Sequence, residues 1–131
     1  MKTAVLALAL ALSTAACATT NPTGVRDPDE FRRVAQRTVI ESALPYADVA
    51  RCFEDRAALL PMSSFIADEA AERTTYRLRG FGYTFEEIAF EAAPGGSRAT
   101  VLMAPNLNTR WREDFARDRG AALALCATGK R

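Results

Sequence analysis

Two changes of hydrophobic period divide the chain into helical, strand-like and again helical segments. Up to Pro61, apolar residues recur at the three- and four-residue spacing of amphipathic helices; within residues 63–103 they alternate with polar ones; from Thr109 the helical spacing returns. Because helices and strands are segregated along the chain, the pattern predicts an α+β fold in which helices from both ends cover one face of an antiparallel sheet.

The first helical segment is expected to begin at Asp27, an acid in the capping position that precedes a proline at the first helical position. Its inward face is predicted to consist of Phe31, Val34, Ala35 and Thr38. Pro45 interrupts the pattern, which resumes with Val49, Cys52, Phe53, Ala57 and Leu60. We therefore expect two helices, or one kinked helix, before Pro61.

The strand-like region is predicted to form an antiparallel meander. Alternation is clearest at residues 76–79, 88–91 and 100–103. Pro94-Gly95-Gly96-Ser97 predicts a hairpin turn because glycine accepts a positive φ, and residues 80–83 predict the turn before it. With a weaker strand at Ser64 to Ala67, the meander has three or four strands.

The closing helix is expected to pack on the same sheet face as the N-terminal helices. Its apolar stripe consists of Trp111, Phe115, Ala122 and Cys126. Gly120 lies inside the helix and weakens it by roughly 1 kcal/mol relative to alanine, so it predicts a local kink or close packing.

Cys52 and Cys126 lie on the apolar stripes of the first and last helical segments, 74 residues apart. Packing both segments on one sheet face would bring the two thiols together, and an oxidising compartment would join them. We predict a disulfide; two buried free thiols are the alternative. No C-x-x-C spacing is present, which argues against a redox oxidoreductase.

The N-terminus has the anatomy of an export signal. Lys2 precedes an unbroken apolar run of nine residues, Ala4 to Leu12, which is followed by small residues and Cys17. A membrane-spanning helix needs about 20 apolar residues, so this run is too short to serve as one. Residues 1–16 are therefore predicted to be a signal peptide, and residues 27–131 a single α+β domain.

Leu12-Ser13-Thr14-Ala15-Ala16-Cys17 resembles the signal of bacterial lipoproteins, in which two small residues precede a cysteine that carries diacylglycerol and becomes the mature N-terminus. Thr14 departs from that pattern, which has Leu, Val or Ile three residues before the cysteine. The resemblance implies lipidation at Cys17, a membrane anchor, and a lipidated tether over residues 17–26. Because Ala18 rather than aspartate follows the cysteine, it also implies the outer membrane, facing the periplasm.

Ordinary signal-peptidase cleavage is the alternative to lipidation. Ser13-Thr14-Ala15 and Ala16-Cys17-Ala18 both satisfy a small-x-small rule, and cleavage there would release a soluble periplasmic protein. The odd number of cysteines favours lipidation, because acylation of Cys17 leaves Cys52 and Cys126 as an even set.

Composition excludes several classes of function. The 17 basic and 16 acidic residues include no long block of like charge, so no nucleic-acid partner is expected. Histidine is absent, which removes the usual neutral-pH proton shuttle, the usual zinc ligand and every nucleophile scheme that depends on imidazole. We expect no cofactor and no metal site.

Glu86, Glu87 and Glu91 are the candidate acid/base residues, since paired carboxylates serve glycosidic hydrolysis. Strand periodicity places Glu87 and Glu91 on the solvent face, whereas Glu86 points with Ile88. Cross-strand ion pairs with Arg77, Arg79 or Arg98 explain them more simply. We therefore expect no catalytic residue.

Tyr76, Phe90 and Trp111 are the candidate ligand-binding residues, if an apolar pocket lies between sheet and helices. A lone tryptophan at the start of an apolar helical stripe is more often part of the core. The leading expectation is a small non-enzymatic envelope lipoprotein that offers a binding or structural module to an unknown periplasmic protein. A soluble periplasmic small-ligand carrier and a carboxylate-dependent hydrolase are the alternatives.

Overall fold

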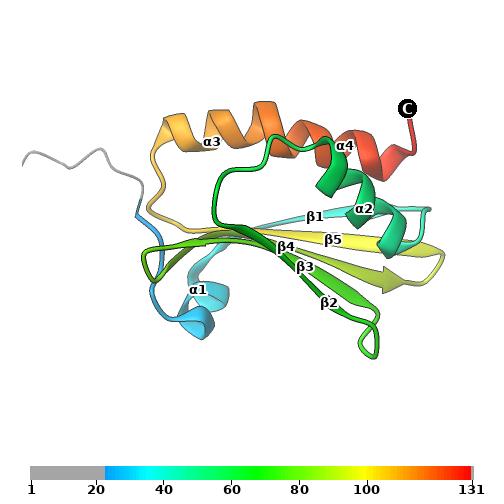
Figure 1. The fold of residues 1–131 in the computed structure, drawn as a ribbon, viewed down its shortest axis with the longest axis horizontal. Helices are drawn as coiled ribbons and strands as arrows, with labels where there is room; N and C mark the ends of the chain where they lie inside the picture. The colour runs from blue at the N-terminus through cyan, green and yellow to red at the C-terminus, as the bar shows by residue number, and fades with distance from the viewer. Residues whose placement is uncertain (1–22, 131) are drawn as a thin grey trace, which may run out of the picture.

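The computed structural model describes residues 23–130 (Figure 1). The predicted signal peptide, the predicted lipidation site Cys17 and the predicted tether as far as residue 22 lie outside the described residues. The helices are α1 (Pro28–Val34), α2 (Tyr46–Arg56), α3 (Thr109–Phe115), a π-helical turn η1 (Ala116–Gly120) and α4 (Ala121–Thr128). The strands are β1 (Gln36–Ser42), β2 (Ser63–Asp68), β3 (Arg73–Gly80), β4 (Tyr83–Ala93) and β5 (Gly96–Met103).

The strands form one five-stranded antiparallel sheet in the order β1-β5-β4-β3-β2. Strands β2 to β5 are the predicted meander, with turns at Phe81-Gly82 and at Pro94-Gly95 as the glycine spacing indicated. The α+β class is confirmed, and the C-terminal helical region packs on the sheet as expected. The sheet has five strands, so the expected count of three or four was too low.

Strand β1 is the element that the sequence analysis missed. Residues 36–42 were interpreted as the continuation of the first helix, with Thr38 on its inward face. In the structure α1 ends at Val34, and β1 pairs with β5 along its whole length, from Gln36 opposite Met103 to Ser42 opposite Ser97. The three successive β-branched residues Thr38, Val39 and Ile40 favour a strand over a helix.

Helix α1 lies on the opposite face of the sheet from the other helices (Figure 1), which corrects the prediction that all helices cover one face. Its buried residue Phe31 packs against Leu102, Ala104 and Leu107, in a small cluster of its own. Leu102 projects from β5 away from its neighbour Val101, which belongs to the main core. Asp27 caps α1 as predicted, accepting a hydrogen bond from the Glu30 backbone N–H at 2.8 Å.

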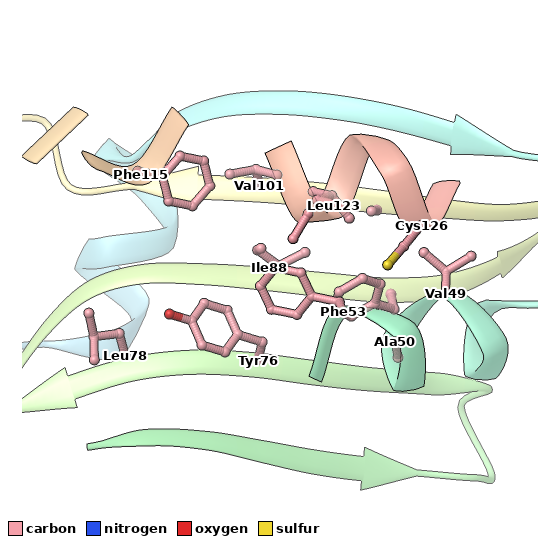
Figure 2. Packing of buried hydrophobic residues seen from close by; sticks show 13 residues of the cluster. Val49, Ala50, Phe53, Tyr76, Leu78, Ile88, Val101, Phe115, Leu123 and Cys126 are labelled. Atoms are coloured by element: carbon pink, nitrogen blue, oxygen red, sulfur yellow. The ribbon is translucent and has the colours of Figure 1, made fainter. Parts of the chain in front are cut away.

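The main core fills the space between the sheet and helices α2 and α4 (Figure 2). Phe53 of α2 lies at its centre, with its ring centroid 5.2 Å from that of Tyr76 and 5.5 Å from that of Phe90. Leu123 and Cys126 of α4 close the core from above the strands. This side of the sheet is therefore packed with side chains from α2, from the strands and from α4, which lie far apart in the sequence.

The predicted disulfide between Cys52 and Cys126 is present and joins α2 to α4. The Cα atoms lie 5.7 Å apart, within the range that an unstrained bridge requires. At Gly120, a Cβ atom would lie 3.2 Å from the Phe115 carbonyl oxygen and 3.3 Å from its ring, so the helix packs closely there, as the sequence suggested. Within residues 23–130, no helix is long and apolar enough to cross a membrane.

Candidate functional site

Two adjacent glutamates of β4 project to opposite faces of the sheet. Glu86 faces the main core with Ile88, as strand periodicity predicted, and its side chain is fully buried. Glu87 faces the side that carries α1 and is 5% exposed. The two carboxylates therefore belong to separate environments and cannot act together on one substrate atom.

Glu86 is enclosed by hydrogen-bond donors. The Tyr76 hydroxyl donates to Oε1 at 2.7 Å, and the indole N–H of Trp111 donates to Oε2 at 3.3 Å. Arg119, in the π-helical turn η1, donates from Nε to Oε1 and from Nη2 to Oε2, the latter at 3.0 Å. The arginine is itself 2% exposed, so this is a buried ion pair bound through two parallel hydrogen bonds.

The electrostatics of the cluster keep Tyr76 neutral and Arg119 charged. Burial and the adjacent charge of Glu86 raise the pKa of Tyr76 far above its ordinary value of 10, so the phenol stays neutral and donates. Burial favours the neutral form of Arg119, but the hydrogen bonds and charge of Glu86 outweigh it and raise the pKa of the guanidinium. The described residues contain no buried side-chain nitrogen or oxygen that lacks a partner.

This arrangement holds separate parts of the fold together. All four donors to Glu86 come from the protein, and neither Glu86 nor Arg119 lines any of the hollows described below. A general acid or base must reach a substrate proton, directly or through one water. The cluster instead fixes η1 against β3 and β4, which explains how an irregular turn is held on the sheet.

Glu87 and Glu91 form ion pairs on the other face of the sheet. Glu87 accepts from Arg77 of β3 at 3.0 Å and from Arg32 of α1 at 3.5 Å. Glu91 accepts from Arg73 at 2.7 Å. The predicted cross-strand partner Arg77 is thus present, whereas Arg79 binds Thr84 and backbone carbonyls and Arg98 lies 3.6 Å from Glu41.

Beside α1 this second face is hollowed. A depression of about 420 Å³ is lined by the side chains of Arg32, Arg37, Arg73, Thr75, Glu87, Ala89, Glu91, Thr100 and Leu102. Val39 of β1 and Ile66 of β2 extend the same face and are 48% and 47% exposed. We call this hollow together with Val39 and Ile66 the open face.

The predicted ligand-binding residues do not meet around a common hollow. Tyr76 and Phe90 are 0% and 1% exposed and pack on Phe53. Trp111 is half-buried and stacks on Phe85, with ring centroids 5.3 Å apart. The hollows identified at Cys52 and Cys126, at the β4–β5 turn, beside α1, beside α2 and at Phe81 are lined by other residues, so ligand binding by these three residues stays a prediction.

Sequence reasoning missed the two arginines that organise these sites. Arg119 follows Phe115 by four residues and precedes Ala122 by three, so it lies on the apolar stripe of the last helix. A charged residue at a core position was the signal for a buried partner. Arg32 carries no comparable signal in the sequence, because only the placement of α1 against the sheet brings it to Glu87.

Within residues 23–130, no group of three or more cysteine, aspartate or glutamate side chains is arranged to hold a metal ion. Comparison of the chain with protein-family models, with curated proteins and with solved structures finds no significant match.

Proposed function

We propose that this protein is a small non-enzymatic envelope lipoprotein, anchored through Cys17 at the outer membrane, whose domain binds a periplasmic protein partner through the open face. The observation that carries the binding role is the contrast between the two faces of the sheet. One is filled by α2 and the C-terminal helices; on the other, α1 covers one end, next to a hollow of about 420 Å³. The hollow is mostly polar, with three arginines in its lining, and the exposed apolar side chains of Val39 and Ile66 lie on the same face; charged groups beside exposed apolar ones suit a protein-binding surface.

The charges of the open face indicate the chemistry of the partner. The hollow is lined by three arginines and two glutamates, and both glutamates are already held in ion pairs within the protein. Among the described residues, no carboxylate lies within ion-pair distance of Arg37. An acidic side chain of the partner that enters the hollow would pair with Arg37, while apolar side chains would cover Val39 and Ile66.

The engagement of the carboxylates supports a non-enzymatic role. Glu86 is enclosed by four hydrogen bonds from protein donors, and Glu87 is bound between Arg77 and Arg32. A hydrolase of the two-carboxylate type needs one carboxyl group free to donate a proton and a second free to attack or to activate water. The pairs described above leave neither group free for these roles.

The anchor is tested by replacing Cys17 with serine. We expect the Cys17→Ser protein to lose metabolic labelling with palmitate and to move from the membrane fraction to the soluble fraction, with its circular dichroism unchanged. Each acyl methylene buried in the bilayer contributes about 0.8 kcal/mol to the free energy of membrane binding, so loss of the acyl chains should release the protein from the membrane. Retention of the variant in the membrane fraction would contradict the lipid anchor.

The binding role is tested with a photo-crosslinking amino acid at Ile66, on the open face, and at Leu125, which is 38% exposed on α4. We expect one discrete protein adduct from position 66 and none from position 125. The adduct should disappear on Arg37→Glu and persist on Arg110→Glu, a matched change on α3. The open face would be ruled out as the binding surface if both positions gave equal adducts, or if the adduct from position 66 persisted on Arg37→Glu.

A further inference from the structure

The turn between β3 and β4 carries the most exposed large apolar side chain of the described residues. Phe81 is 90% exposed, and Met62 and Leu60, which precede β2, are 53% and 40% exposed. Met62 lies against Gly80, where its terminal atoms occupy the space that a Cβ would take. We call Leu60, Met62 and Phe81 the tip.

The backbone holds the tip in an unusual conformation. Phe81 has φ 53° and Met62 has φ 71°, the left-handed region in which glycine or asparagine is usual. At the next position Gly82 also has a positive φ, of 81°. The turn therefore projects a large aromatic side chain into solvent at a position where a small polar residue would satisfy the backbone better.

The N-terminal segment of the domain is fixed at this same end. Val25 and Thr84 exchange two backbone hydrogen bonds, of 2.9 and 2.8 Å. Gly24 lies so close to β4 that a Cβ atom would be 2.7 Å from the Thr84 carbonyl oxygen and 2.8 Å from the Cβ of Tyr83. Figure 1 shows the chain entering the fold beside the β3–β4 turn, at the end away from the C-terminus.

Chain length then limits how far the tip can lie from Cys17. Thr23, the first described residue, follows Cys17 by six residues, and six extended residues span at most about 20 Å. Residues 18–22 are Ala-Thr-Thr-Asn-Pro and carry no charge. A lipid on Cys17 would therefore hold the tip, rather than the opposite end of the sheet, next to the membrane surface.

Positive charge flanks the exposed aromatic side chain. The Arg26 guanidinium lies over the ring of Tyr83, 5.2 Å from its centroid, and Arg79 donates to the carbonyl oxygens of Gly82 and Arg26. Arginines beside an exposed aromatic residue suit the boundary between anionic headgroups and acyl chains. The adjacent acid Asp27 is engaged as the cap of α1.

We propose that the tip is a membrane-contact site, at which Phe81 enters the headgroup–acyl boundary of the bilayer that holds the Cys17 lipid. This inference rests on the proposed lipid anchor. In this orientation the strands run away from the membrane. The C-terminal end of α4 and the β4–β5 turn lie at the far end (Figure 1), and the open face stands sideways, accessible to a periplasmic partner.

The test measures the depth of residue 81 directly. The Phe81→Trp protein, extracted in detergent, is reconstituted into vesicles of phosphatidylethanolamine and phosphatidylglycerol, with and without bromine on the acyl chains. Trp111, the single tryptophan of the chain, supplies a background that is measured in the unsubstituted protein and subtracted. Leu125→Trp on α4 is the matched control. We expect the indole at position 81 to shift its emission to shorter wavelength and to lose intensity in brominated vesicles, and the indole at position 125 to do neither.

A second arm of the experiment distinguishes failure of the membrane contact at the tip from failure of the lipid anchor at Cys17. The chain beginning at Cys17 keeps every contact described above, since all lie within residues 23–130, and the disulfide leaves Cys17 as its one free thiol. Coupling that thiol to a maleimide lipid in the same vesicles supplies the anchor whether or not cells acylate Cys17. Quenching at position 81 in this arm supports membrane contact by the tip even if the protein is not labelled with palmitate in cells. The membrane-contact proposal is overturned if quenching is absent in both arms. It is also overturned if the emission shifts without bromine quenching, which is the result that contact with a second protein would give.

Discussion

Glu86 and Arg119 form a buried ion pair, so removal of either side chain leaves the other without its partner. Glu86→Leu leaves the Arg119 guanidinium buried without its partner, and we expect the free energy of unfolding to fall by about 3–5 kcal/mol. The double variant Glu86→Leu/Arg119→Met removes both charges and should recover most of that loss, as measured by urea unfolding. Arg73→Ala, which breaks a half-exposed pair, serves as control and should cost under about 1 kcal/mol. A double variant as unstable as the single one would contradict this account.

The raised pKa of Tyr76 makes stability depend on alkaline pH. Above its ordinary value of 10, the unfolded chain loses the phenolic proton while the folded protein keeps it, so stability is fully present below pH 10 and decreases above it. The decrease attributable to Tyr76 should approach about 1.4 kcal/mol for each pH unit. Unfolding of Tyr76→Phe between pH 7 and 11 should lack this component, and the two proteins should show parallel profiles below pH 9.

For the buried cluster, the sequence predicted the orientation of Glu86 but not the identity of its partner. Strand alternation placed Glu86 on the Ile88 face, because a period of two is local information. Its partner Arg119 lies 33 positions later in the sequence, and their contact depends on how a π-helical turn packs on the sheet. No local pattern carries that packing, although an arginine on an apolar stripe signalled that some buried acid must exist.

Two helices are joined by the Cys52–Cys126 disulfide, and its loss should weaken the whole domain. For a loop of this size, the chain-entropy model gives about 4–4.5 kcal/mol of stabilisation. We expect the Cys52→Ala/Cys126→Ala protein to lose about 2–5 kcal/mol of unfolding free energy, measured by thermal denaturation. Reduction of the unsubstituted protein should give the same loss, and a reduced protein as stable as the oxidised one would show that the bridge adds nothing.

Elements with local signals were predicted and those set by distant pairing were not. The capped start of α1, both glycine turns and the last helix each have their determinants within a few residues. Among the described residues, strand β1 lies at the edge of the sheet and pairs with β5, about 60 positions away in the sequence. The helical pattern before it was extended through its β-branched residues, so the predicted sheet lacked this strand.

At the scale of the molecule, the prediction of one helical layer was wrong because no strand was expected between the two predicted helices, or within the one kinked helix, before Pro61. With β1 between them, α1 crosses to the other face and divides it into a covered end and the open face. The interruption at Pro45 was visible in the sequence, but the side of the sheet on which α1 settles depends on Phe31 finding Leu102 and Leu107.

This division of one face predicts unequal costs for two similar substitutions. Leu102 and Ile66 project to the same face, but Leu102 is 6% exposed beneath α1 whereas Ile66 is 47% exposed on the open face. Leu102→Ala should lower the free energy of unfolding by about 2–5 kcal/mol, because it leaves a cavity under Phe31. Ile66→Ala should cost under about 1 kcal/mol, because its side chain is already half in water. Urea unfolding of the two variants measures the difference directly. Equal costs would mean either that α1 does not cover Leu102 or that the open face is covered in the isolated protein, and hydrogen exchange at Phe31 would decide between the two.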